Sequence, residues 1–395
     1  MALALLVSFF ATTKGAAQAV NPALYPVKVG GKYGYIDARG KLVVPAQFDA
    51  AGDFDAGLAP VKIGPRWGFI DAAGKTVIAP QFDLAWGFRD NVALVQLGTS
   101  LTGRRTRLIG RDGRFITTGE YASARVLGGG LIGIEVRGKW GIVDSDGHTT
   151  VSPRFDEIAE VGEGVLPFRR GAVWGFVDPA GKIIVPAQFD TARPFADTLA
   201  AVEINRARDT SAVCRADRVT CVGHWGFIGH DGRFVIPATY DSAASFAEGL
   251  ARIEVDRRDS PHPECRPHVS LVQCGGKIGF LDRTGRIVIA PAYDRAWDFA
   301  NGRARVERAG KVGFIDRQGA TVVDLRFDAA GDFRDGLAPA RAGAQWGYID
   351  ASGAFAIPPR FDDAGPFVSG LARVTSGGRV GYIDHAGDFV WAAGD

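Results

Sequence analysis

The chain has 395 residues, of which 46% are hydrophobic and 23% charged, and its 46 basic and 44 acidic residues leave it almost neutral. This composition is typical of a soluble globular chain. It excludes general nucleic-acid binding, which needs a concentrated basic field.

The first residues predict a secretory signal peptide. Ala2 to Phe10 form a short apolar run, and Ala17-Gln18-Ala19 is a small-x-small cleavage pattern, although Lys14 follows the apolar run instead of preceding it. A membrane anchor is the poorer alternative, because about nine apolar residues cannot span a bilayer that needs about 20. No other stretch is long enough to be transmembrane. We therefore expect residues 1–19 to be cleaved off and residues 20–395 to form one repeat domain, periplasmic or secreted.

A short phrase, Trp-Gly-Phe-Ile-Asp or a close variant, then recurs ten times. Measured from the Gly of one copy to that of the next, with Arg107 at the Gly position in one copy, successive copies are 34, 39, 34, 34, 51, 53, 34, 34 and 34 residues apart. A fixed period of this length predicts repeated units that stack on their neighbours. The three longer steps predict insertions near residues 97–106, 205–222 and 256–275, as loops or hairpin extensions that leave the stacking face untouched.

The unit at residues 58–90 shows how a repeat is built. Residues 58–63, 67–71 and 75–82 are strand-like runs joined by short turns that contain Gly, which favours antiparallel hairpins. Residues 83–88 lead to the next unit. No apolar stripe with helical period appears, so we expect little helix. The predicted fold is all-β, a tandem array of about ten three-stranded antiparallel units of 34 residues.

Alternation within the strand explains the phrase. Trp67 and Phe69 lie on one face, and Gly68 and Ile70 on the other. Because Gly weakens a strand unless another group approaches closely, we expect an aromatic ring of a neighbouring unit to pack over each Gly. The Asp that ends the phrase is expected to accept backbone N–H bonds across the following turn.

We interpret the repeated residues as structural. The Trp-Gly pairs are Trp67, Gly68, Trp140, Gly141, Trp174, Gly175, Trp225, Gly226, Trp346 and Gly347. A recurring Phe in the connectors is expected to plug neighbouring units together, at Phe54, Phe88, Phe195, Phe246, Phe299, Phe333 and Phe367.

The repeat is most degenerate near Arg107, which stands in place of the Gly. Basic residues gather there and in the last insertion. A decayed repeat with a solvated basic face explains them, and a contact patch for an anionic surface or acidic partner is the alternative. The candidate binding residues are Arg104, Arg105, Arg107, Arg111, Arg257 and Arg258.

All four cysteines lie in the two long insertions. In an exported chain, local pairs are typical of disulfides, and we favour Cys214–Cys221 and Cys265–Cys274 among the three possible connectivities. Each bond would limit the entropy of its loop, by about 2–3 kcal/mol. A metal site is the alternative, with candidate ligands His262, Cys265, His268, Cys274, Cys221 and His224.

The chain resembles the bacterial WG-repeat family, also called KWG repeats. The residues that carry the resemblance are Lys139-Trp140-Gly141, residues 66–71 and residues 346–350, supported by Gly57-Leu58-Ala59-Pro60-Val61 and Pro186-Ala187-Gln188-Phe189-Asp190. It covers about residues 24 to 391. The resemblance implies an exported protein of variable copy number, and it supplies no catalytic residues.

No catalytic motif is present: the sequence has no Gly-x-Ser-x-Gly, no HExxH and no P-loop. We expect no enzyme, no cofactor and no metal. The predicted architecture is an open superhelical array, because no terminal strand is visibly shared to close a ring; a closed propeller-like ring is the alternative.

The leading functional hypothesis is a non-enzymatic, monomeric binding or scaffold protein of the bacterial envelope or exterior. It would recognise a protein or envelope polymer through loops on a rigid array. The alternatives are a carbohydrate-active enzyme with a propeller-like funnel, which requires a closed ring, and metal binding by the Cys and His residues of the insertions.

Overall fold

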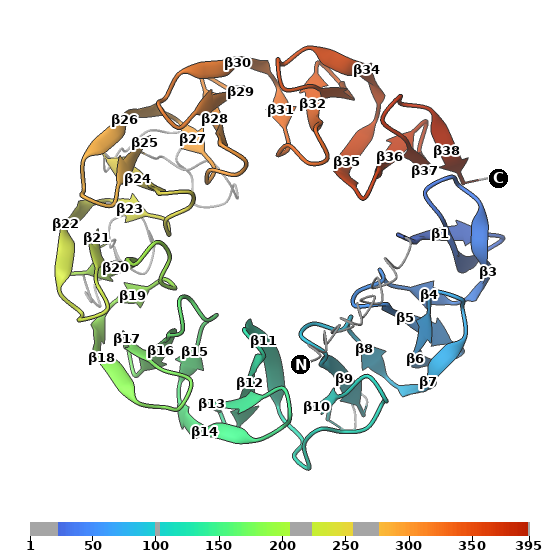
Figure 1. Ribbon diagram of the computed structural model, residues 1–395, viewed down its shortest axis with the longest axis horizontal. Coiled ribbons are helices and arrows are strands. Elements are labelled where there is room, and N and C mark those ends of the chain that lie inside the picture. Colours follow the sequence, from blue (N-terminus) through green and yellow to red (C-terminus); the bar gives the residue numbers. More distant parts are fainter. Residues whose placement is uncertain (1–22, 99–102, 206–222, 256–275, 394–395) are drawn as a thin grey trace, which may run out of the picture.

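Ten small antiparallel sheets follow one another around a closed ring (Figure 1). The computed structural model describes residues 23–98, 103–205, 223–255 and 276–393. Within these residues the regular structure consists of strands alone, so the all-β prediction is confirmed. The expected open array is wrong, and the propeller-like ring, given above as the alternative, is the architecture. We number the sheets in chain order as blades 1 to 10.

Most blades have one strand more than the sequence predicts. Blades 1 and 3 have three strands and the other eight have four. The additional strand comes from the connector, where two residues such as Ala50–Ala51 pair with Val61 and Lys62 of the next strand. A two-residue strand is too short to show alternation in the sequence. In each four-stranded blade it lies toward the centre of the ring, and the last strand lies at the circumference (Figure 1).

In blades 1 to 5 the strands run in chain order from the inner to the outer side of each blade. Their bounds are β1 Tyr25–Val29, β2 Lys32–Ile36 and β3 Leu42–Phe48; β4 Ala50–Ala51, β5 Leu58–Ile63, β6 Arg66–Asp71 and β7 Thr76–Phe82; β8 Leu84–Ala85, β9 Ala93–Leu97 and β10 Arg105–Ile109; β11 Ser123–Gly128, β12 Leu131–Val136, β13 Lys139–Asp144 and β14 Thr149–Phe155; β15 Glu157–Ile158, β16 Leu166–Arg170, β17 Val173–Val177 and β18 Ile183–Phe189.

Blades 6 to 10 follow the same order. Their strands are β19 Thr191–Ala192, β20 Ala200–Ile204, β21 His224–Ile228 and β22 Phe234–Tyr240; β23 Ser242–Ala243, β24 Leu250–Val255, β25 Lys277–Asp282 and β26 Ile287–Tyr293; β27 Arg295–Ala296, β28 Arg303–Arg308, β29 Lys311–Asp316 and β30 Thr321–Phe327; β31 Ala329–Ala330, β32 Ala338–Ala342, β33 Gln345–Ile349 and β34 Phe355–Phe361; β35 Asp363–Val368, β36 Leu371–Ser376, β37 Arg379–Ile383 and β38 Phe389–Ala392.

The glycine of the phrase is required by its own blade and not by a neighbouring one. Between the pairs Trp67↔Phe82 and Phe69↔Ile78 the register shifts, so that the outer strand bulges. A Cβ on Gly68 would lie 2.5 Å from the carbonyl oxygen of Ile78, and the backbone of the bulge fills the space. The expectation of an aromatic ring over this Gly is therefore wrong, because the backbone of the bulged outer strand occupies that space.

The connector Phe residues join neighbouring blades, as the sequence predicts. Phe88 packs edge-to-face on Phe69 of blade 2 with ring centroids 5.0 Å apart, and Phe299 packs in the same way on Phe280 of blade 7. Edge-to-face pairs of this kind add about 0.5–1.5 kcal/mol to the free energy of burial. Equivalent pairs involve Phe54, Phe195, Phe246, Phe333 and Phe367.

Two kinds of carboxylate close the turns of a blade. The Asp that ends the phrase accepts backbone N–H bonds across the next turn, as Asp71 Oδ1 does from Ala73 and Lys75. A second Asp, directly after the outer strand, pairs with the Lys before the Trp-Gly, as Asp156 does with Lys139 at 2.5 Å. The Lys of the phrase is thus an ion-pair partner of the connector.

The ring closes between blade 10 and blade 1 without a shared strand. Tyr25 Oη donates to the carbonyl oxygen of Ser369 at 2.7 Å, and Tyr382 Oη donates to that of Pro26 at 3.2 Å. Their rings lie 5.5 Å apart within an apolar cluster that includes Leu371. Burial raises the pKa of Tyr382 to about 12, so its hydroxyl stays a donor. A similar contact joins blades 1 and 2, where Tyr35 Oη donates to the carbonyl oxygen of Gly52.

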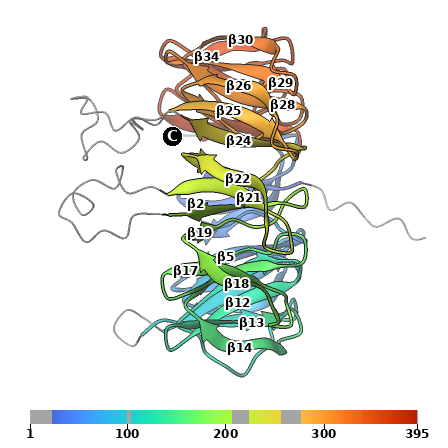
Figure 2. The same ribbon diagram turned by 90° about the vertical axis from the view of Figure 1, so that its left-hand side faces the viewer.

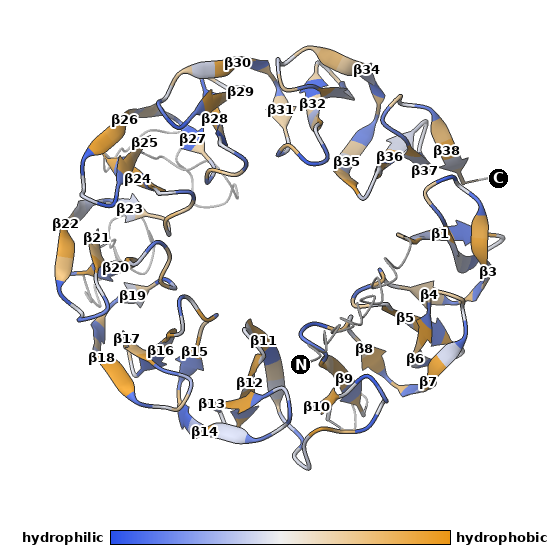
Figure 3. Ribbon diagram, viewed as in Figure 1, coloured by the Kyte–Doolittle hydropathy of each residue, from blue (hydrophilic) through white to orange (hydrophobic). Residues whose placement is uncertain are grey.

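Apolar side chains are exposed along the circumference. Figure 3 shows much of the outer strands β18, β22 and β26 in hydrophobic colours, and Figure 2 shows these strands side by side along the edge of the ring. Ile183, Phe234, Val235 and Ile287 at the starts of these strands are 37–51% exposed. This row lies on the outer edge, separate from the inner side described next.

Candidate functional site

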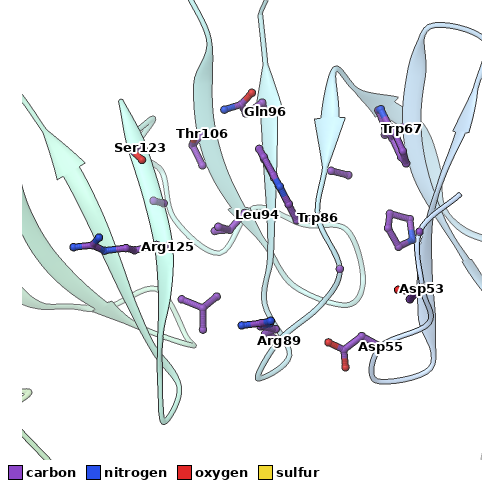
Figure 4. A pocket seen from close by; sticks show the side chains of 16 residues that line it. Asp53, Asp55, Trp67, Trp86, Arg89, Leu94, Gln96, Thr106, Ser123 and Arg125 are labelled. Atoms are coloured by element: carbon purple, nitrogen blue, oxygen red, sulfur yellow. The ribbon is translucent and has the colours of Figure 1, made fainter. Parts of the chain in front are cut away.

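A cavity of about 770 Å³ opens on the inner side of blades 2, 3 and 4 (Figure 4). Its size falls within the range of about 300–1,000 Å³ that is typical of small-molecule sites. Pro60, Leu94 and Val126 contribute apolar surface to the cavity, and Trp67 and Trp86 contribute aromatic surface.

In blades 7 and 8 an Arg occupies the corresponding space. Arg252 of blade 7 and Arg305 of blade 8 each lie opposite the aromatic residue of the phrase on the neighbouring strand. Arg252 Nη1 donates to the carbonyl oxygen of Ala296 at 2.7 Å, and Arg305 Nη1 donates to that of Ala330. Both carbonyls belong to the innermost strand of the next blade. We call this contact the arginine clasp.

Blades 2 and 3 lack the arginine clasp. The same register position, opposite Phe69 in blade 2 and Leu108 in blade 3, holds Pro60 and Leu94. Neither side chain can reach across the boundary or donate a hydrogen bond. The clasp is therefore missing at both boundaries of blade 3, where the cavity lies. Blades 5, 6 and 9 also lack an Arg at this position, which holds Pro167, Ala201 and Pro339.

Blade 4 has an arginine at its inner side that turns away from the cavity. The guanidinium of Arg125 stacks 4.4 Å from the ring centre of Trp140 and donates to the carbonyl oxygen of Ile158 in blade 5. In Figure 4 its head points away from Trp86. Arg125 thus holds the boundary between blades 4 and 5 and contributes only its stem to the cavity.

Trp86 is the most exposed aromatic residue of the cavity, with 46% of its surface accessible. Its counterpart in blade 8 is Trp297, which also directly follows the innermost strand. Trp297 lies between two guanidinium groups, with Arg305 at 3.9 Å and Arg295 at 5.4 Å from its ring centre. In blade 3 Leu94 takes the place of Arg305, and no cation covers Trp86 in the described part of the chain.

Polar groups surround Trp86. Figure 4 shows Gln96 above the indole ring, Arg89 below it, and Asp53 and Asp55 on the side of blade 2. Gln96 Oε1 is buried and accepts no hydrogen bond from the described residues. The side chains of Asp53, Asp55 and Arg89 are exposed, and within residues 23–98 and the other described ranges they make no hydrogen bond or ion pair. Such groups are available to a ligand.

Two smaller cavities adjoin this one. A cavity of about 420 Å³ shares Asp55, Arg89 and Val126 with it. A cavity of about 610 Å³ shares Asp53 and lies at the ring closure, where blade 1 lacks an innermost strand. The cavities therefore lie in one sector of the ring, which also contains both three-stranded blades.

The arginines predicted near the third repeat are partly used within the fold. Arg107 Nη2 donates to the carbonyl oxygen of Thr117 at 3.0 Å, and its guanidinium lies 3.6 Å from the ring centre of Phe115. Arg111 Nη1 donates to the carbonyl oxygen of Ala56 in blade 2 at 2.5 Å. These two arginines brace the degenerate blade.

Arg104 and Arg105 are exposed at the start of β10. Arg257, Arg258, Cys214, Cys221, Cys265 and Cys274 lie outside the described residues, as do His262, His268 and the predicted signal peptide.

One group of side chains has the composition of a metal site. Asp144, Asp146 and His148 lie within 4.8 Å of one another in an exposed turn. Asp144 Oδ1 already accepts the backbone N–H groups of Asp146 and His148, which is the turn contact made in most blades. The arrangement is explained by the turn alone.

The sequence contains a signal for the cavity that the repeat interpretation did not use. Trp86 and Trp297 follow the same connector position, and the residues eight positions later are Leu94 and Arg305. Only an alignment of blade against blade shows that the clasp is lost in one case and kept in the other.

Comparison with solved structures gives likenesses of low identity. A eukaryotic initiation factor is 10% identical with a TM-score of 0.49, covering 94% of this chain and 96% of that chain. Kluyveromyces lactis Hsv2p is 7% identical with a TM-score of 0.36, covering 66% and 92%. The β-propeller domain of the Trilobed protease from Pyrococcus furiosus, described as having an open velcro topology, is 11% identical with a TM-score of 0.33, covering 65% and 90%. No conclusion about activity follows from these values.

No curated protein matches the chain in sequence. The family model described as "WG containing repeat" matches eight segments that cover more than half of the chain. They are residues 33–64, 67–98, 140–172, 174–206, 225–257, 278–311, 313–343 and 346–379. The chain therefore belongs to the WG-containing repeat family.

Proposed function

We propose that this protein is a non-enzymatic binding protein of the bacterial cell envelope or exterior. The ring is its scaffold, and the cavity at blades 2 to 4 holds its ligand. The observation that supports this most is the cavity itself, in which no cation covers Trp86 and the side chains of Asp53, Asp55 and Arg89 have no hydrogen-bond or ion-pair partner among the described residues.

The rest of the ring supplies a rigid frame for such a site. Aromatic pairs and carboxylate-capped turns recur from blade to blade, and side chains cross most boundaries to reach backbone carbonyls. Sites on rigid elements lose little conformational entropy on binding. The cavity in this rigid frame is then a suitable place for ligand recognition.

The insertions are the second part of this proposal. All three interrupt the hairpin between the second and third strands of a blade, after β9, β20 and β24. The strand ends that flank the insertions therefore lie on one side of the ring. Arg104 and Arg105 border the first of them and are exposed, so they remain candidate contacts for an acidic partner.

A substitution that fills the cavity tests the main part of the proposal. Gly87 has no positive φ, and the nearest atom to a Cβ built there is Asp55 Cβ at 3.8 Å. Asp298 occupies the same position in blade 8, so the backbone accepts a side chain. Gly87→Phe should fold normally and lower saturable binding of the labelled protein to isolated envelope fractions at least about tenfold.

The control variant lacks residues 206–220 and 257–273. Unchanged binding by Gly87→Phe would refute the cavity as the site. If only the deletion variant loses binding, the insertions are the contact surface, and the absence of saturable binding by the wild type would refute a binding role.

A carbohydrate-active enzyme is the second candidate, because the ring is closed as that hypothesis requires. Asp53 and Asp55 both border the cavity. Asp298 and Asp332 stand at the repeat position of Asp53, whereas Arg89, Ala300 and Arg334 stand at that of Asp55, so Asp55 is the carboxylate that the repeat does not supply. Carboxylates that are not demanded by the repeat are candidates for acid–base catalysis.

Incubation with oligosaccharides followed by mass spectrometry separates the two candidates. The binding proposal expects no cleavage products. Cleavage by the wild type that is lost in both Asp53→Asn and Asp55→Asn would instead establish the enzyme.

A further inference from the structure

We infer that the cavity takes a short, uncharged oligosaccharide and that one sugar ring stacks on Trp86. This inference rests on the proposed binding function and names its ligand class. It is carried by the open indole face, by the hydrogen-bonding groups around it and by the shape of the adjoining cavities.

The exposed face of the Trp86 indole favours a ligand with a flat, weakly polar surface. In blade 8 the same position is satisfied by cations, because guanidinium groups lie at 3.9 and 5.4 Å from the ring centre of Trp297. Trp86 has no such cover and is 46% exposed beside Leu94. The C–H face of a sugar ring is flat and apolar, so it can bury the indole while its rim stays polar.

The polar groups near Trp86 require a ligand that both donates and accepts hydrogen bonds. Gln96 Oε1 and the carboxylates of Asp53 and Asp55 accept only, whereas Arg89 donates only. A buried acceptor such as Gln96 Oε1 costs free energy until a donor reaches it. Hydroxyl groups arranged around a ring can serve both kinds of partner at once.

Other ligand classes fit these groups less well. A carboxylate or an ionised phosphate ester group has no proton to donate to Gln96, and its negative charge would be repelled by Asp53 and Asp55. A quaternary ammonium ion would suit those carboxylates, but it cannot donate a hydrogen bond to Gln96 and would be repelled by Arg89. An uncharged polyol satisfies all four side chains.

The size of the site indicates more than one sugar ring. The main cavity measures about 770 Å³, and the adjoining cavity of about 420 Å³ shares Asp55, Arg89 and Val126 with it. A chain bound on Trp86 can therefore continue past Arg89 toward blade 5. We expect affinity to rise with chain length until both cavities are filled.

The test uses the intact protein and a defined set of probes. Titration calorimetry would measure binding of the tetramers of β-linked glucose, α-linked glucose, β-linked N-acetylglucosamine and β-linked mannose, with choline and adenosine monophosphate as probes of the other classes. We expect at least one tetramer to bind and the two other probes not to bind. Trp86→Ala should weaken binding at least about tenfold, and Trp86→Phe should restore part of it.

The matched control is Trp297→Ala, which removes the same residue type from the same position in blade 8. It should leave the affinity within about twofold of the wild type, because Trp297 does not line the cavity. Thermal unfolding of each variant shows whether it is folded.

Three outcomes would overturn the inference. They are binding of choline or adenosine monophosphate in place of a sugar, equal loss of affinity in Trp86→Ala and Trp297→Ala, and no binding of any tetramer. If no tetramer binds but Gly87→Phe still abolishes binding to envelope fractions, only the ligand class is wrong and the proposed function stands. If envelope binding does not respond to Gly87→Phe, the proposed function fails as well.

Discussion

Gly68 is held in place by the backbone of the neighbouring strand. A Cβ at this position would lie 2.5 Å from the carbonyl oxygen of Ile78 and 2.8 Å from the nitrogen of Pro80. Backbone atoms in a paired strand cannot move aside easily, so we expect Gly68→Ala to lower the free energy of unfolding by about 1–3 kcal/mol. Urea denaturation at neutral pH measures this loss.

Gly87→Ala provides the comparison, since the nearest atom to its added Cβ is 3.8 Å away. It should change the stability by no more than about 0.5 kcal/mol. Equal effects of the two substitutions would show that the bulge in the outer strand does not explain the glycine of the phrase.

Ala56 is strained in the loop between β4 and β5. Its φ is 47°, in the left-handed region where a Cβ costs about 1–2 kcal/mol. After allowing for the greater freedom of glycine in the unfolded chain, we expect Ala56→Gly to raise the free energy of unfolding by about 0.5 kcal/mol. Thermal and urea unfolding of the variant check the sign of the change.

Glu163 occupies the same position in blade 5 with a φ of 50°, but its carboxylate accepts the backbone N–H of Thr198 in blade 6 at 3.0 Å. Glu163→Gly loses that bond while it relieves the strain, so it should not be stabilising. A gain in Glu163→Gly as large as that in Ala56→Gly would contradict this account.

The sequence predicts the roles of single repeated residues well when their partners are local. The turn contacts of Asp71 and the pairing of Phe88 with Phe69 follow from position in the repeat. The role of Gly68 was mispredicted, because a shift in register between two strands leaves no pattern of its own in one strand.

Among the elements, the hairpin that carries the Trp-Gly phrase is tied to the following connector by a Lys–Asp pair. The side chain of Lys139 donates to Asp156, which also accepts the N–H of Gly171, and together these bonds lower the pKa of Asp156 below its ordinary value of 3.8. The same pairing lowers the pKa of Asp49, Asp294 and Asp328.

These pairs predict a loss of stability in acid. Because the pKa of Asp156 is lower in the folded state, the pair stabilises the fold above pH 3.8, and this contribution disappears as the pH falls through the folded pKa. Lys139→Met should therefore be less stable than the wild type at neutral pH, and the difference should shrink toward zero between about pH 5 and pH 2. Urea midpoints across that range measure it.

Lys75→Met removes a lysine whose side chain has no ion pair within the described part of the protein. Its effect should not vary with pH over the same interval. A pH-independent deficit in Lys139→Met would mean that the lysine acts through its aliphatic stem and not through its charge.

At the scale of the whole molecule, the ring depends on one boundary that no connector spans. Tyr25 and Tyr382 supply both hydrogen bonds and apolar area there. Tyr25→Ala combined with Tyr382→Ala removes two large buried side chains, so we expect the ring to open while its blades remain folded. Small-angle scattering should show a larger radius of gyration, and circular dichroism should show an unchanged β content.

Tyr348→Phe is the control, because Tyr348 Oη makes the same contact, to Gly365, at a boundary that the chain itself crosses. It should cost about 1 kcal/mol without expansion. A double variant that keeps the dimensions of the wild type would show that the remaining contacts suffice to close the ring.

Sequence analysis named both an open array and a closed ring, and for a physical reason it could not choose correctly between them. The hydrogen bonds of Tyr25 join residues 343 and 344 positions apart, and nothing in a 34-residue period states the angle between one sheet and the next. Periodicity correctly indicated the third repeat as unusual. It directed attention to the arginines of that repeat, whereas the cavity is lined by Trp86, Gln96, Pro60 and Leu94.

The phrase tyrosine at the closing boundary, Tyr382, donates to a backbone carbonyl of the next blade, as Tyr35 and Tyr348 do at ordinary boundaries. Closure of the ring therefore uses a kind of contact that also joins consecutive blades. A circular permutant that links the present ends and begins at another blade boundary would keep every such contact. Descendants of the protein could likewise gain or lose whole repeats anywhere around the ring, with only its curvature left to adjust. Under the proposed function, exchange of the sector around Trp86 for another blade would change what the protein recognises.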